Sequence, residues 1–138
     1  MKITLRSTDA PLGYVGVNDR DQTQTFSGGA DACRPMETVL MAMAACSSID
    51  VETLLAKMRA PATGVEVSVE AERAEGVPAV FTKVHLRYRI RGDVPEHKAA
   101  KAVRMSMDQY CSVSMMLRAS VEITYEVEVA PAGSKGEA

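Results

Sequence analysis

Three cysteines, Cys33, Cys46 and Cys111, are the side chains of this sequence best suited to redox chemistry. An odd number of cysteines cannot all pair within one chain, and a reducing compartment would keep them as thiols. We expect no metal site, because the sequence has no Cys-x-x-Cys pair and its two histidines, His85 and His97, stand alone in the sequence. The cysteines therefore serve either as small packing residues or as reactive thiols.

Cys46 lies within the stretch RPMETVLMAMAACSSIDV, in which almost every residue is apolar or small. Pro35 suits the first turn of a helix because it has no N–H group to lose, and Glu37 places a carboxylate near the positive end of the helix dipole. We therefore expect a long helix from about Pro35 to about Met58, with Cys46 inside it.

This long helix is predicted to be covered on several sides, because apolar and small residues also fill most other faces of its first half. The polar residues of its second half, Asp50, Glu52 and Lys57 among them, are predicted to reach water before Pro61 ends the helix. Residues at three- and four-residue steps form the predicted buried stripe, namely Met36, Leu40, Met43, Ser47, Val51, Leu54 and Met58.

Cys111 is predicted to lie at the start of a short helical turn through residues 112–117. A second helix is expected before it, from about Pro95 to Gln109, with a break at Tyr110 and Cys111. A thiol just before the free N–H groups of a helix has its anion stabilised by those groups and by the helix dipole. The inner stripe of the second helix is predicted to contain Ala99, Ala102, Val103 and Met107.

Six segments have the composition or alternation of β-strands. Three short ones, KITLRS, YVGV and TQTFS, predict an N-terminal antiparallel meander, and the other three cover residues 65–71, 83–91 and 121–129. The outward residues of strand 65–71 include glutamates, and those of strand 83–91 are basic, so antiparallel pairing would align opposite charges. This pairing explains the charges better than an acidic ligand does, and His85 is interpreted as a surface residue.

The chain as a whole is predicted to be a single α+β domain, residues 1–138, with a frayed tail at residues 130–138 and the element order βββ-α-ββ-α-β. Its composition, 46% apolar and 25% charged, is typical of a globular protein. With a net charge of −2 and interspersed charges, nucleic acid is not an expected partner. No membrane span or signal peptide is expected, and a cytoplasmic location is predicted.

Two stretches, RPMETVLMAMAACSSIDV and MDQYCSVSMML, resemble the two cysteine-bearing motifs of the OsmC/Ohr superfamily, the osmotically induced and organic hydroperoxide resistance proteins. The segment VFTKVHLRYRIRG between them is similar as well, so the resemblance covers nearly the whole chain. It implies an OsmC-like fold and an intertwined homodimer, in which the long central helices are buried and the two cysteines approach one another.

The resemblance also implies a reaction. Cys46 matches the peroxidatic thiol, which attacks the peroxide, and Cys111 matches the resolving thiol, which closes a disulfide with it. The implied substrate is an organic hydroperoxide, the implied partner is an external dithiol reductant, and no cofactor is implied. Cys33 matches neither motif.

The chain departs from the hydroperoxide-resistance branch at the start of the long helix. That branch has a glutamate directly after the proline, paired with an arginine of the N-terminal sheet, whereas this sequence has Met36 there and resembles a less characterised Pro-Met-Glu branch. Glu37 follows, but it is predicted to face away from Cys46. The candidates for the supporting arginine are Arg6, Arg20 and Arg34.

Two other functions are compatible with the same residues. Nine methionines, many of them on the two helices, could line an apolar ligand-binding cleft between subunits, although ordinary core packing explains them more simply. Alternatively, the two thiols could form a disulfide without turnover and act as a redox sensor.

Overall fold

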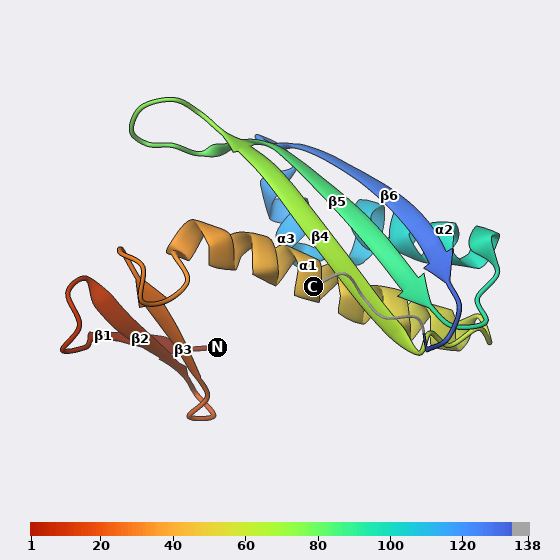
Figure 1. Ribbon diagram of the computed structural model, residues 1–138, viewed down its shortest axis with the longest axis horizontal. Coiled ribbons are helices and arrows are strands. Elements are labelled where there is room, and N and C mark those ends of the chain that lie inside the picture. Colours follow the sequence, from red (N-terminus) through yellow and green to blue (C-terminus); the bar gives the residue numbers. More distant parts are fainter. Residues whose placement is uncertain (134–138) are drawn as a thin grey trace. The chain divides into compact units, whose positions relative to one another are not determined.

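The computed structural model describes residues 1–133 of the chain. Contacts divide the chain into two compact units, Met1–Met41 and Ala42–Ala138. The order of strands and helices confirms the predicted α+β class (Figure 1). The predicted tail begins at the last residue of a strand, Ala130, and residues 134–138 lie outside the described part.

The first unit contains the predicted meander. Strands β1 (Ile3–Ser7), β2 (Gly13–Asn18) and β3 (Thr23–Ser27) pair antiparallel in sequence order. Helix α1 (Pro35–Lys57) begins in this unit and continues through the second. Its first turn is capped by Glu37, whose carboxylate accepts a hydrogen bond of 3.0 Å from the Arg34 backbone N–H. Glu37 therefore stabilises the helix start.

The second unit is built on a sheet of β4 (Gly64–Arg73), β5 (Phe81–Arg91) and β6 (Glu122–Ala130). Strand β5 is central; it pairs antiparallel with β4 and parallel with β6. Alternate residues of β5 are almost fully buried, which confirms the predicted inner face: Val84, Leu86, Tyr88 and Ile90.

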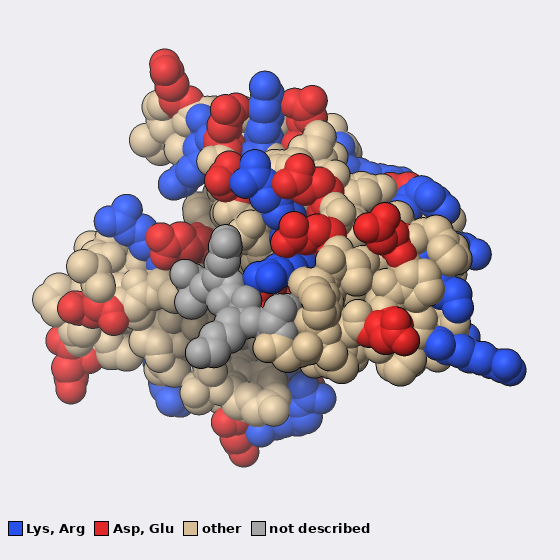
Figure 2. Space-filling model, turned by 45° about the vertical axis from the view of Figure 1, so that its right-hand side comes forward, with Lys and Arg blue, Asp and Glu red and all other residues tan. Residues whose placement is uncertain are grey.

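The outer face of this sheet carries the charges that the sequence places there. The register sets Glu66 opposite Arg89 across β4 and β5, and Arg89 opposite Glu128 across β5 and β6. His85 is part of this network, with its Nε2 atom 3.7 Å from a carboxylate oxygen of Glu126. Figure 2 shows the two signs of charge intermingled on the face in view. The structure thus confirms opposite charges across β4 and β5.

Helices cover the inner face of the β4–β6 sheet (Figure 1). After β5 come α2 (Glu96–Met105), the short π-helix η1 (Ser106–Tyr110) and α3 (Ser112–Leu117). The break predicted at Tyr110 and Cys111 falls at Cys111 alone. All four residues of the predicted inner stripe of the second helix are buried: Ala99, Ala102, Val103 and Met107.

Helix α1 confirms the predicted span and corrects its predicted stripe. Three members of the predicted stripe are buried, and Leu55, which the stripe did not include, is fully buried as well. The other four members are only half-buried: Met36, Leu40, Leu54 and Met58. The predicted stripe mixes steps of three and four and so stays on one face, whereas the observed buried residues are four apart, and each step of four turns about 40° around a straight α-helix. The buried residues of α1 are Met43, Ser47, Val51 and Leu55.

By length and composition alone, α1 is also apolar enough to cross a membrane, with a mean hydropathy of 1.6 in its most apolar window. This corrects the expectation that no segment approaches such a span, which overlooked a helix interrupted by a few polar residues. A helix in the core of a globular domain passes the same test. In the second unit one face of α1 packs against the sheet, because Val51 and Leu55 are fully buried and the Ser47 hydroxyl lies 2.6 Å from the Tyr88 hydroxyl of β5.

Candidate functional site

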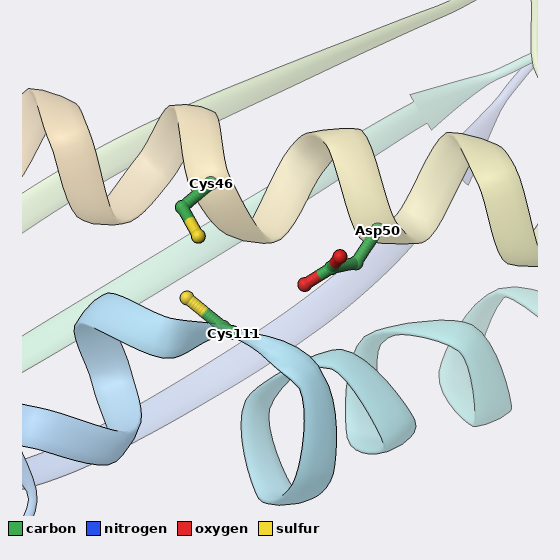
Figure 3. Close-up of side chains that lie close together, drawn as sticks. All are labelled: Cys46, Asp50 and Cys111. Carbon is green, nitrogen blue, oxygen red and sulfur yellow. The ribbon is translucent and has the colours of Figure 1, made fainter. Parts of the chain in front are cut away.

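The second unit brings Cys46 and Cys111 together. Cys46 and Asp50 lie one turn apart on α1, while Cys111 directly precedes α3 (Figure 3). The two Sγ atoms and a carboxylate oxygen of Asp50 all lie within 4.8 Å of one another. Both cysteines are free thiols, and a disulfide requires its sulfurs to be about 2.05 Å apart. A movement of less than about 3 Å would therefore join them.

Cys111 lies in a closed environment. Its side chain is fully buried, and its Sγ accepts a hydrogen bond of 3.2 Å from the Ser114 hydroxyl. Burial raises the pKa of the Cys111 thiol, and the hydrogen bonds from Ser114 offset only part of this effect. The predicted stabilisation of its anion by the helix start is thus outweighed, because α3 is short and desolvation dominates.

Asp50 belongs to this site and reaches water only in part, whereas Glu52 and Lys57, which the same prediction placed in water, are exposed. The Asp50 side chain is half-buried, and its Oδ2 accepts a hydrogen bond of 3.2 Å from the hydroxyl of Ser106, the first residue of η1. That hydroxyl also lies 3.1 Å from the Ser47 carbonyl oxygen. The π-helix therefore presents a buried hydroxyl to α1, which holds the Asp50 carboxylate beside the thiols.

A second buried contact fixes α1 against the sheet. The Tyr88 hydroxyl lies 2.6 Å from Ser47 Oγ and donates a hydrogen bond of 3.3 Å to Met107 Sδ. Burial raises the pKa of Tyr88 to about 12, with the hydrogen bond to Ser47 opposing the shift. Tyr88 is thus held in its neutral form beside Ser47, the residue that follows Cys46.

This raised pKa predicts a loss of stability at alkaline pH. Above about pH 10 the unfolded state releases the Tyr88 proton while the folded state retains it, so the free energy of unfolding falls until about pH 12. The shift corresponds to at most about 2–3 kcal/mol. Tyr88→Phe is expected to cost about 1 kcal/mol at pH 7, through the lost hydrogen bond, and to flatten the decline between pH 10 and 12. Urea unfolding at pH 7 and between pH 10 and 12 measures the free energy of unfolding of both proteins. A variant whose free energy falls as steeply as that of the wild type would show that Tyr88 is not the group responsible.

The other candidate residues lie in the first unit. Cys33 precedes α1, and its carbonyl oxygen accepts a hydrogen bond from the Ser27 N–H. Arg6 lies on β1, Arg20 in the turn between β2 and β3, and Arg34 just before α1. A role for one of these arginines in supporting Cys46 stays a prediction.

Comparisons with known proteins agree with this architecture. Residues 28–126 match the family model described as OsmC-like protein. Protein YhfA of Escherichia coli K12 is 41% identical over 107 residues, which cover 77% of this chain and 80% of YhfA.

Two solved structures extend the comparison. A hypothetical protein from Aquifex aeolicus VF5 is similar with a TM-score of 0.81 and 25% identity, covering 94% of this chain and 96% of that one. An organic hydroperoxide resistance protein OsmC from Legionella pneumophila has a TM-score of 0.71 at 15% identity, covers 94% of this chain and 98% of its own, and shows likeness of fold alone. The family match and the identity to YhfA establish that this chain belongs to the OsmC-like protein family.

Proposed function

We propose that the protein is a thiol-dependent peroxidase that reduces organic hydroperoxides. The observation that carries this proposal is that the Cys46 and Cys111 sulfurs lie within 4.8 Å of each other. Cys46 lies on α1, and Cys111 directly precedes α3. Membership of the OsmC-like family, whose fold is shared by a protein named for organic hydroperoxide resistance, supports the choice of substrate.

The proposed reaction has three steps. The Cys46 thiolate attacks one peroxide oxygen, the O–O bond breaks, and the other oxygen takes up a proton and leaves as the alcohol. The resulting Cys46 sulfenic acid condenses with the Cys111 thiol, forming the disulfide and releasing water. An external dithiol then reduces the disulfide by thiol exchange and is itself oxidised to a disulfide.

The surroundings of the sulfurs support different roles for the two cysteines. Cys46 is half-buried and thus partly exposed to solvent, whereas Cys111 is fully buried. Because burial raises the pKa of Cys111, this thiol is the poorer nucleophile of a free peroxide. It remains suited to resolution, since a sulfenic acid at Cys46 forms directly beside it.

We also infer that the working form is a homodimer. Apolar side chains of the second unit remain more than half exposed in the single chain: Ile49 on α1, Tyr110 on η1 and Met116 on α3. Large apolar side chains left in water on neighbouring helices favour a partner surface. We infer that this partner is a second copy of the chain, because the resemblance to the OsmC/Ohr superfamily implies a homodimer.

The proposal is tested by mass spectrometry after one equivalent of cumene hydroperoxide. Fully reduced protein is treated, the remaining thiols are alkylated, and peptides are mapped. The expected product has lost two hydrogen atoms and carries a Cys46–Cys111 disulfide, with Cys33 alkylated. The Cys33→Ser variant serves as the matched control and is expected to give the same disulfide. Oxidation confined to Cys33, or protein that remains fully reduced, would contradict the proposal.

A thiol redox sensor would give the same disulfide, so turnover separates the two functions. With an excess of dihydrolipoamide, a peroxidase consumes many equivalents of hydroperoxide per chain. A sensor consumes one equivalent at a useful rate and then stops. Sustained consumption supports the peroxidase.

A further inference from the structure

The site around the two thiols contains a third donor that the peroxide chemistry does not use. The Asp50 carboxylate lies within 4.8 Å of both sulfurs, and it comes from the same helix face as Cys46. With both thiols ionised, the cluster would hold three negative charges close together, which repel one another. A divalent cation placed between them would remove this repulsion.

The donor types select the kind of cation. Two thiolates are soft ligands that favour zinc and similar thiophilic ions over magnesium or calcium, which prefer oxygen. Zinc binds sulfur at about 2.3 Å, so tetrahedral ligands lie about 3.8 Å apart. The three donor atoms are already within 4.8 Å of one another, so a contraction of about 1 Å suffices. A water molecule would complete the four-coordinate shell.

The neighbours of these donors already orient two of them. Ser106 donates a hydrogen bond of 3.2 Å to Asp50 Oδ2, and Ser114 donates one of 3.2 Å to Cys111 Sγ. Such outer hydrogen bonds fix the position of metal ligands and tune their basicity. Ser106 and Ser114 are both fully buried, so the donor positions are set by core packing.

We propose that the reduced protein binds one thiophilic divalent cation, such as Zn²⁺, through Cys46 Sγ, Cys111 Sγ and the Asp50 carboxylate. Binding displaces the two thiol protons. It occupies both sulfurs and therefore blocks the attack of Cys46 on a peroxide. This proposal departs from the expectation of no metal site in the sequence analysis, because only the folded chain brings the three residues together.

The cation would make the site a redox-dependent metal site. A bound cation dissociates and rebinds, and an organic hydroperoxide oxidises the metal-free thiols to the disulfide, with formation of the alcohol and one water. Because the disulfide cannot rebind the cation, oxidation leaves the cation in solution. This regulatory consequence depends on the proposed peroxidase function. The binding itself does not, so the two can be tested apart.

Binding is tested on the full chain with Zn²⁺ alone, under anaerobic conditions and without peroxide. A chromogenic chelator competes for the ion, and Co²⁺ in place of Zn²⁺ reports sulfur coordination through charge-transfer absorption. We expect one ion per reduced chain, none per chain oxidised to the Cys46–Cys111 disulfide, and unchanged affinity in Cys33→Ser. Cys46→Ser and Cys111→Ser are each expected to lower the affinity at least about 100-fold, and Asp50→Asn at least about 10-fold.

Binding that survives both cysteine variants, or affinity unchanged in Asp50→Asn, would overturn the proposed ligand set, as would reduced protein that takes up no Zn²⁺. Circular dichroism of each variant confirms that it is folded, and Ser106→Ala provides a second variant that keeps all three donors and is expected to weaken binding less than Asp50→Asn. Peroxide consumption by metal-free protein is measured separately. Its failure would refute the peroxidase while leaving the metal site intact.

Discussion

The Cys46→Ser variant is expected to lose hydroperoxide turnover by a factor on the order of 10³ or more. A serine hydroxyl stays protonated at neutral pH and cannot form the sulfenic acid on which the cycle depends. The measurement is the steady-state consumption of cumene hydroperoxide with dihydrolipoamide as reductant. The protein is freed of metal with a chelator beforehand, so that an occupied site does not mimic an inactive one.

Two further variants make this result specific. Cys33→Ser carries the same substitution at the cysteine that matches neither motif, and it is expected to keep the full rate. Cys111→Ser retains the attacking sulfur but has no resolving partner, so without reductant it is expected to consume one equivalent and stop as the Cys46 sulfenic acid. Turnover that persists in Cys46→Ser would mean that another thiol performs the attack.

The sequence predicted the elements that carry the site better than the site itself. Alternation along residues 83–91 identified the inner face of β5, including Tyr88, because the side chains of a strand point to opposite faces in turn. The span of α1 followed from Pro35 at its start and from a long apolar stretch. These features are local, so they can be read from neighbouring residues.

The approach of Cys46 to Cys111 depends on tertiary structure. The two residues lie far apart in the sequence, and only the resemblance to a known family suggested that they meet. The two cysteines approach each other because α1 and η1 pack on the same sheet. Ser106 of η1 joins the two helices directly through its hydrogen bonds to Ser47 and Asp50 of α1. Long-range contacts of this kind leave no periodic signal in the sequence.

The position of Asp50 beside Cys46, unlike that of Cys111, could have been predicted from the local sequence. Residues four apart on a helix lie on the same face, so Asp50 shares the face of Cys46. The flanking charges of Glu52 and Lys57 suggested instead that this whole end of the helix was solvated. The buried hydroxyl of Ser106, which binds the carboxylate, is what keeps Asp50 at the site, and that contact depends on the fold.

The largest expected effect on stability comes from α1, where two adjacent leucines differ in burial. Leu55 is fully buried in the second unit, while Leu54 is half-buried. Leu55→Ala is expected to lower the free energy of unfolding by about 2–5 kcal/mol, because it removes buried methyl groups and leaves a cavity. Leu54→Ala is expected to cost roughly half of that or less, since less of its apolar surface leaves water on folding.

The comparison of these two variants isolates burial from other causes. Both replace leucine by alanine within one helix, so the change in helix propensity is the same and cancels. Urea unfolding of the reduced, metal-free protein, followed by circular dichroism, gives both free energies and shows whether the denaturant slope is preserved. A Leu54→Ala variant as unstable as Leu55→Ala would show that a further surface covers Leu54, and the proposed homodimer would supply it. In that case the instability of Leu54→Ala is expected to diminish as the protein concentration rises, because association stabilises the folded chain.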